Sequence, residues 1–319
     1  MVSSKAECSI SSWYPEFAKD ALDTVILPLS DDILKYLEHD NFVLPVEATN
    51  DKICESEWAD GSPVNHDSLE SQESEAQPTF PEFSKKIQDV IDDFGAVFIK
   101  SNWRTPLDAT WVSPTKTLKC TCLEDVYLLL KSSDRISGDI NAVKEFSTNN
   151  QTLSPCLVLK KWRDINPCTE FRCFVVHKEL IGICQRDGSQ YHQYIEAEKY
   201  SIRKDITSLF MERIKNRFGL DSYSFDVIRY KKDKVKIIDF GPLDESVTKG
   251  TLFTYAELQD SIIEPPEFRF IGENMGIQPN NSSNTPFCVP QEINELFRAA
   301  GENSMMDLIR REVENQTIE

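Results

Sequence analysis

The sequence contains one stretch that predicts a β-hairpin: Ser222-Tyr223-Ser224-Phe225-Asp226-Val227-Ile228-Arg229-Tyr230, the polar run Lys231 to Lys234, and Val235-Lys236-Ile237-Ile238-Asp239-Phe240. Both ends are rich in β-branched and aromatic residues, which favour strands. The polar run between them is typical of a tight turn. We therefore expect two adjacent antiparallel strands.

The two aspartates of this hairpin lie thirteen residues apart and face each other if the turn centres on Lys232-Asp233. Pairing by reflection then sets Phe225 opposite Phe240, Val227 opposite Ile238 and Asp226 opposite Asp239. Directly opposed side chains have Cβ atoms roughly 5 Å apart, and like charges there are destabilising. A divalent cation, its shell completed by nucleotide phosphate, would offset that cost. The alternative is a hairpin of different register with one exposed carboxylate.

The composition is that of a globular protein, since 40% of the 319 residues are hydrophobic and 28% are charged. No apolar run approaches the length that spans a membrane. The first eight residues lack the apolar core of a signal peptide. Nine cysteines without such a leader suggest reduced thiols in the cytosol or nucleus. We expect a protein of one of these compartments, without a membrane partner and with a monomer as the default.

The formal net charge of −18 argues against nonspecific binding of nucleic acid, which is itself an anion. This charge suits a basic protein partner. It is equally consistent with simple solubility, so the charge alone does not select between the two interpretations.

Three segments have an irregular or polar sequence. Residues 51–80 contain eight acidic residues and one basic residue, Lys52, with few apolar anchors, and predict a flexible, disordered acidic loop. Residues 137–155 are polar and predict irregular structure. Residues 271–319 are broken by prolines and then predict two terminal helices, so this segment is expected to be a helical tail.

Several charged residues follow or lie within predicted strands. Residues 96–100 form a buried type of strand that ends in Lys100, and residues 156–162 form an apolar strand that turns basic at Lys160-Lys161. Glu170 and Arg172 lie on one face of a further strand, because side chains alternate along a strand. Phosphate binding here would have to come from such side chains, since the sequence has no glycine-rich phosphate loop.

The order of these residues resembles an ATP-grasp nucleotide site, and the longer motifs resemble the cell division cycle protein 123 family. The motifs that carry the resemblance are Trp13-Tyr14-Pro15, Lys131-Ser132-Ser133-Asp134, Leu157-Val158-Leu159-Lys160-Lys161-Trp162, Glu170-Phe171-Arg172-Cys173-Phe174, Gln185-Arg186-Asp187 and Ile238-Asp239-Phe240. The resemblance covers about residues 13–270. The acidic loop and the tail match only loosely.

The resemblance implies an α+β fold of the ATP-grasp-like kind, in which two α/β lobes with antiparallel sheets enclose a nucleotide site. We expect an N-terminal lobe over residues 1–155, which includes the acidic loop, and a C-terminal ATP-grasp lobe over residues 156–270. The helical tail over residues 271–319 would follow.

The resemblance also implies ATP as a ligand. Lys100 would reach the phosphates as a point charge, and Asn102 in the following loop is a further candidate contact. The hinge would cover the adenine and bind its edge; it comprises Leu159, Lys160, Lys161 and Trp162. Glu170 would take a ribose hydroxyl or orient a lysine, and Arg172 would pair with phosphate. Arg186 is a candidate for the terminal phosphate. Without the resemblance, Lys100 is better interpreted as a surface lysine at a strand end, and the hinge residues as a core strand with a solvated basic end. Glu170 and Arg172 would then form a structural ion pair along one strand face.

Magnesium would be held by Asp226 and Asp239 and would bridge the phosphates. The family usually has asparagine two residues after the second aspartate, whereas this sequence has Gly241. Glycine has no side-chain oxygen, which puts a second metal site in doubt. Water, Asp244 or Glu245 could take its place.

The resemblance implies an assembly chaperone that binds ATP and Mg²⁺, binds the gamma subunit of eukaryotic translation initiation factor 2 and promotes its joining to the other subunits. Such a role links the chain to translation initiation and cell-cycle progression. The alternative is an ATP-grasp ligase that forms an acyl-phosphate on an unknown carboxylate substrate. A scaffold with a vestigial nucleotide site is less consistent with the charged residues retained.

Overall fold

The structure is a computed structural model, and it describes residues 2–39, 41–49, 77–113, 115–148, 153–260 and 265–273. The chain divides into two compact units, and all of these residues belong to the first, Met1–Ser282. Residues 51–76 of the predicted acidic loop and residues 274–319 of the predicted tail lie outside the described residues. None of the described helices is long and apolar enough to cross a membrane.

A four-stranded antiparallel sheet forms the first lobe, in the order β1-β4-β2-β3. Its strands are β1 (Thr24–Pro28), β2 (Val97–Lys100), β3 (Lys119–Cys120) and β4 (Cys156–Lys161). The sequence places the lobe boundary between residues 155 and 156. However, β4 pairs with β1 and β2, so this strand belongs to the sheet of the first lobe. β4 belongs to this sheet because its apolar residues, including Leu157 and Leu159, form part of the hydrophobic core of the first lobe.

Apolar residues of the helices in this lobe share one hydrophobic core with the four-stranded sheet. They are α3 (Asp31–Glu38), η1 (Val46–Ala48), α4 (Pro81–Phe94), η2 (Leu107–Val112), α5 (Leu123–Lys131) and α6 (Asp134–Thr148). The prediction of irregular structure over residues 137–155 was therefore wrong for most of that segment. Ile136, Ile140 and Val143 recur at helical spacing and are buried, which stabilises α6.

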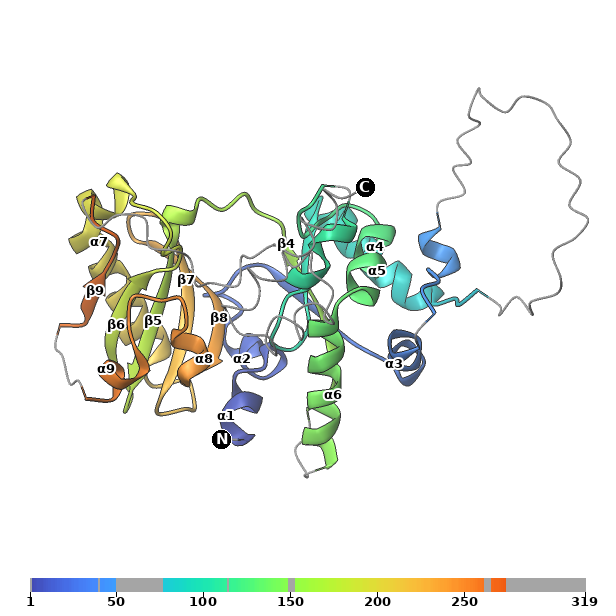
Figure 1. Cartoon of the computed structure of the whole chain (residues 1–319), viewed down its shortest axis with the longest axis horizontal. Coiled ribbons are helices and arrows are strands. Elements are labelled where there is room, and N and C mark those ends of the chain that lie inside the picture. The colour runs from blue at the N-terminus through green and yellow to red at the C-terminus, as the bar shows by residue number, and fades with distance from the viewer. Residues whose placement is uncertain are drawn as a thin grey trace, which may run out of the picture. The chain divides into compact units, whose positions relative to one another are not determined.

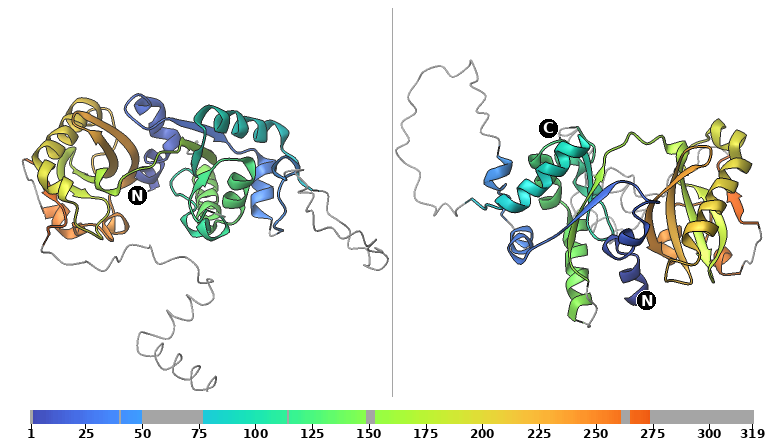
Figure 2. Two further views of the ribbon diagram at one scale, coloured as in Figure 1. Left: turned by 90° about the horizontal axis from the view of Figure 1, so that it is seen from above. Right: turned by 180° about the vertical axis from the view of Figure 1, so that it is seen from behind.

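A five-stranded sheet forms the second lobe, in the order β8-β7-β5-β6-β9 (Figures 1 and 2). Its strands are β5 (Glu170–Val176), β6 (Glu179–Gln185), β7 (Tyr223–Lys231), β8 (Lys234–Pro242) and β9 (Glu267–Arg269). Only β9 is parallel to its neighbour among the described strands. The other elements here are η3 (Pro167–Thr169), α7 (Gln193–Leu209), the π-helical η4 (Phe210–Ile214), α8 (Glu245–Thr248) and α9 (Tyr255–Asp260).

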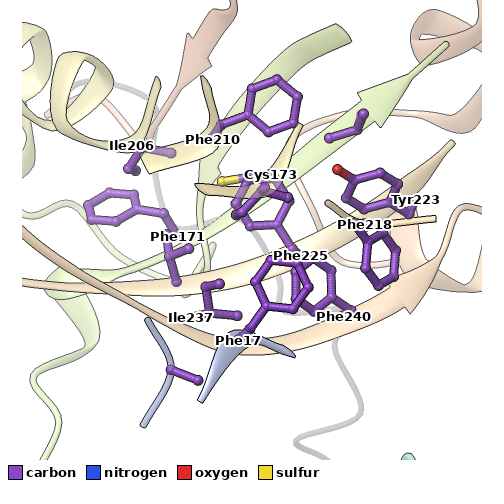
Figure 3. Packing of buried hydrophobic residues seen from close by; sticks show 14 of the residues in the cluster. Phe17, Phe171, Cys173, Ile206, Phe210, Phe218, Tyr223, Phe225, Ile237 and Phe240 are labelled. Atoms are coloured by element: carbon purple, nitrogen blue, oxygen red, sulfur yellow. The ribbon is translucent and has the colours of Figure 1, made fainter. Parts of the chain in front are cut away.

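One face of the five-stranded sheet is covered by an aromatic core (Figure 3). Phe225 and Phe240 point into it from β7 and β8, and Phe210 and Phe218 meet them from the helical segment. The rings of Phe218 and Phe240 stack with centroids 4.2 Å apart. Because alternate strand residues point to opposite faces, this core directs Asp226 and Asp239 to the other face.

The central hairpin has the predicted turn, and Asp226 pairs with Asp239 as predicted. Lys232-Asp233 connects the strands, with Asp233 in the left-handed region at φ 57°. The predicted pairing of Val227 with Ile238 was wrong, because a register shift after Asp226 sets Val227 opposite Ile237. A bulge of this kind bends the strand locally and re-aims the neighbouring side chains.

The N-terminal helices α1 (Val2–Glu7) and α2 (Ile10–Phe17) belong to the packing of the second lobe. Trp13 and Phe17 are buried in the aromatic core beside Phe240. Ala21 then forms a parallel bridge with Ile237 of β8 before the chain enters β1. The N-terminal segment therefore connects the two sheets at the edge of the hairpin.

Candidate nucleotide site

Residues from both sheets line one cavity of about 720 Å³, which we call the main cavity. It gathers most of the candidate residues from the sequence: Lys100, Lys160, Lys161, Trp162, Glu170, Arg172, Arg186, Asp226 and Asp239. The first four come from the ends of β2 and β4, and the others come from β5, β7, β8 and the loop after β6. The main cavity thus lies between the charged edges of the two sheets.

Three neighbouring strands present a row of charged side chains. Arg172 on β5 lies directly opposite Asp226 on β7, which in turn lies opposite Asp239 on β8. Arg172 donates two hydrogen bonds of 2.7 Å to the two oxygens of Asp226, from Nε and Nη2. Burial works to raise the pKa of Asp226, but the Arg172 guanidinium outweighs it and holds that pKa below its usual range. Asp226 is therefore ionised.

Lys100 and Asp239 form an ion pair across the main cavity. The Lys100 side chain is only 2% exposed, and its ammonium group donates to Oδ2 of Asp239. The other carboxylate oxygen, Oδ1, is buried and has no hydrogen-bond partner among the described residues. A buried carboxylate oxygen without a partner is costly, so this atom has unused capacity to bind a cation or a donor.

The ammonium group of Lys160 is buried beside the same carboxylate. It donates to the backbone oxygen of Ile238, one residue before Asp239. The pKa of Lys160 is lowered to about 7, mainly by burial; the Asp239 charge opposes this shift and the Lys100 charge contributes to it. Lys160 is thus close to its midpoint of titration at neutral pH. An anion bound beside it would favour the charged form.

Glu170 and Arg186 meet at the wall of the main cavity near Asp226. The backbone N–H of Arg186 donates to the backbone oxygen of Glu170 at 3.0 Å. The Arg186 Nε atom lies 3.6 Å from Oδ2 of Asp226. Burial raises the pKa of Glu170, and the Asp226 charge raises it further. Burial and the Asp226 charge therefore both favour the protonated form of Glu170.

The donor set fits one magnesium ion bound together with phosphate. Mg²⁺ is commonly held by one or two carboxylates, with phosphates and waters completing its octahedral shell. Asp239 offers the free Oδ1, and each oxygen of Asp226 retains a lone pair beyond its bond to Arg172. Among the described residues no group of three or more His, Cys, Asp or Glu could hold a metal by itself. A metal here would therefore depend on ligand oxygens.

Gly241 occupies the position of the family asparagine, and the two carboxylates that could replace that asparagine, Asp244 and Glu245, differ in position. Gly241 pairs with Ser224, and a Cβ atom there would approach Ser224 Oγ to 3.0 Å. Asp244 accepts hydrogen bonds from the backbone N–H groups of Ser246 and Val247 and so caps α8. Glu245 is exposed and does not line the main cavity. Neither Asp244 nor Glu245 forms a hydrogen bond or ion pair, with any residue that the structure describes, that directs its carboxylate toward Asp226 and Asp239.

Part of the lining of the main cavity is apolar, and we call this part the apolar end. It comprises Leu22, Phe98, Trp162 and Ile238, and the ring centroids of Phe98 and Trp162 lie 6.5 Å apart. The backbone N–H of Trp162 donates to Ala96 and so fixes the end of β4. An apolar end beside a charged end suits a ligand with a flat ring and an anionic tail.

Two predicted residues do not reach the main cavity. Leu159 is fully buried in the core of the first lobe. Asn102 is 1% exposed, and its side chain bonds Ser9, Ser154 and the backbone N–H of Cys156. Asn102 therefore links the N-terminal segment to the start of β4.

Arg104 and Arg135 also line the main cavity, although no role was predicted for them. Arg104 follows Trp103 in the loop after β2, and Arg135 lies in the first turn of α6. Asp139 of α6 accepts a 2.6 Å hydrogen bond from Arg104 Nε, and the charges of Arg104 and Asp139 both act on Arg135. A helical interpretation of residues 134–148 would have placed Arg135 and Asp139 on one face, at i and i+4.

A model of the D123 family matches residues 13–297 of this chain. The translation initiation factor eIF2 assembly protein of Xenopus laevis is 33% identical over 329 residues, which cover 95% of this chain and 94% of the relative. Cell division cycle protein 123 of Yarrowia lipolytica is 39% identical over 235 residues, which cover 73% of this chain and 62% of that protein.

The solved structure of Cdc123 from Schizosaccharomyces pombe matches this fold with a TM-score of 0.67 and 31% sequence identity. The match covers 86% of this chain and 98% of that one. The α+β fold with antiparallel sheets expected from the sequence is confirmed. The chain belongs to the D123 family, the family of cell division cycle protein 123.

Proposed function

We propose that this chain binds ATP with Mg²⁺ and acts as an assembly chaperone for translation initiation factor eIF2, through the gamma subunit of that factor. The role in eIF2 assembly is supported by the names of its relatives in Xenopus laevis and Xenopus tropicalis. One observation carries the nucleotide part: Asp239, paired with Lys100, keeps a buried and unbonded oxygen beside Asp226.

The adenine would lie at the apolar end of the main cavity, against Phe98, Trp162 and Ile238. The phosphates would lie between Lys100, Lys160 and Arg172, which supply positive charge from both lobes. Asp226 and Asp239 would hold the magnesium ion. Mg²⁺ neutralises phosphate charge when bound, and the chain's own cations orient the phosphate tail.

Nucleotide would favour one arrangement of the two lobes because its ring and its phosphates contact both. That arrangement would bind the gamma subunit more tightly. The net charge of −18 supports a partner with a basic surface and raises the rate of encounter more than the affinity. We place this role in the cytoplasm, with the chain acting as a monomer and without direct contact to nucleic acid.

Binding of the purified eIF2 gamma subunit tests this function. Affinity should be at least several-fold higher with ATP and Mg²⁺ than with EDTA, because nucleotide selects the binding arrangement. Biolayer interferometry with the immobilised subunit would measure it, and lysozyme, another basic protein, serves as a control for charge alone. No binding to the subunit, or equal binding to lysozyme, would contradict the partner assignment.

Lys160 gives the proposed site a pH dependence. Its pKa of about 7 means that it loses its proton as the pH rises above neutrality, and bound phosphate would hold that proton in place. ATP affinity should therefore fall above about pH 7, by up to about tenfold per pH unit. Titrations at several pH values would show this slope in the wild type and its loss in Lys160→Met. If ATP affinity depended on pH in the same way in Lys160→Met, the titrating group would be one other than Lys160.

A further inference from the structure

A second cavity of about 520 Å³ adjoins the main cavity at its charged end. The two cavities share six lining residues: Trp103, Arg104, Arg135, Arg172, Asp226 and Asp239. Five of these six are charged, whereas the apolar residues Leu22, Phe98, Trp162 and Ile238 line only the main cavity. A ligand whose ring lies at the apolar end would therefore extend its last charged group toward this shared wall.

Arg135 differs from the other arginines of the shared wall. Arg172 is neutralised by Asp226, and Arg104 by Asp139. Arg135 donates from Nε to the backbone oxygen of Thr105 at 3.0 Å, and no ion pair joins it to a carboxylate of the described part of the chain. Its charge is thus the least compensated one on this wall.

The electrostatics of Arg135 agree with this geometry. Burial lowers its pKa, the neighbouring Arg104 charge lowers it further, and Asp108 and Asp139 oppose the shift only in part. A half-buried guanidinium close to a second guanidinium is stabilised by an anion between them. The wall therefore offers an anion site with planar, bidentate donors.

We propose that Arg135 binds the terminal phosphate of a nucleoside triphosphate and makes this site prefer the triphosphate to the diphosphate. This inference rests on the proposed nucleotide function and deepens it. The inner phosphates would lie nearer to Lys100 and Lys160, which are present for both nucleotides. Only a third phosphate would extend to the wall that contains Arg135.

The same contact would make the arrangement of the two lobes depend on which nucleotide is bound. Arg135 belongs to α6 of the first lobe, whereas Asp226 and Asp239 belong to β7 and β8 of the second. A terminal phosphate between them joins the two lobes, and its loss removes that connection. The arrangement that binds a protein partner would then depend on the third phosphate.

Arg186 is the rival candidate for this role. It lines only the main cavity, is 40% exposed and lies 3.6 Å from Asp226, so part of its charge is already compensated. Arg163 provides a matched control, because it lines the main cavity at the apolar end and pairs with Asp23. Replacing Arg135, Arg186 or Arg163 by methionine removes one positive charge in each case.

Isothermal titration of ATP and of ADP, each with Mg²⁺, into the full-length chain tests the proposal. Arg135→Met should weaken ATP binding by roughly tenfold or more and leave ADP binding nearly unchanged, because a charge-assisted contact to the third phosphate is lost. Arg135→Lys should lose less ATP affinity than Arg135→Met, since lysine keeps the positive charge but lacks the paired N–H donors of the guanidinium group. Arg163→Met should leave the ratio of the two affinities unchanged.

Thermal unfolding of each variant without nucleotide would verify that the fold is retained. An equal loss for ATP and ADP in Arg135→Met, or no loss for either, would overturn the proposal. A selective loss of ATP in Arg186→Met alone would assign the terminal phosphate to Arg186. If the wild type bound neither nucleotide, the proposed function would fail first, and this inference with it.

Discussion

Asp239→Asn should abolish most of the Mg²⁺-dependent affinity for ATP while the chain stays folded. The substitution keeps the shape of the side chain but removes the charge beside Lys100 and the carboxylate oxygen that has no partner. Loss of an outer partner of a metal site already costs roughly 10–100-fold in affinity, and loss of a direct oxygen ligand should cost at least as much. Calorimetric titration of ATP with Mg²⁺ would measure the change.

Asp164→Asn is the matched control for this substitution. Asp164 lines the apolar end of the main cavity and accepts a hydrogen bond from Trp162, which asparagine can also accept. It loses the same charge and should keep wild-type affinity within a few-fold. Equal effects of the two substitutions would mean that net charge, rather than a metal ligand at Asp239, controls ATP binding.

Arg229→Met should lower the free energy of unfolding by about 3–5 kcal/mol, the usual cost of breaking a buried ion pair. Arg229 is 1% exposed and donates to Asp205 at 2.7 Å, to Tyr194 at 2.6 Å and to Ser201 at 2.8 Å. Asp205 also accepts from the backbone N–H of Asp233 in the turn of the central hairpin. The substitution leaves the Asp205 charge buried and without its main partner. Urea unfolding would measure the loss.

The double variant Arg229→Met/Asp205→Asn should recover part of this loss, because it removes the unpaired charge as well. Lys35→Met is the surface control. Lys35 and Asp32 form a pair in which both side chains are more than three-quarters exposed, so its loss should change stability by less than about 1 kcal/mol. A small effect of Arg229→Met, similar to that of Lys35→Met, would contradict a structural role for the buried pair.

The central hairpin could be predicted from the sequence because its strands and its turn carry independent local signals. β-branched and aromatic residues gave the strands, and the two-residue turn gave the pairing of Asp226 with Asp239. The register shift after Asp226 could not be predicted. It depends on how Val227 and Ile237 pack in the aromatic core, which is a tertiary effect.

The candidate site was predictable where its residues lie on strands. Arg172 and Asp226 fall on neighbouring strands, and alternation places their side chains on the face opposite to the core. Arg135 was missed because α6 was interpreted as irregular. Within the predicted hinge, the sequence did not distinguish Lys160, whose side chain lines the main cavity, from Leu159, whose side chain is buried in the core.

Titration of ATP into the wild-type chain, with Mg²⁺ and then with EDTA, tests the central claim most directly. The facing aspartates, the free oxygen of Asp239 and the lysines beside it predict saturable binding of one ATP per chain in Mg²⁺, weakened at least about tenfold in EDTA. No binding in either buffer would mean that these charges stabilise the fold alone and that the nucleotide function is wrong.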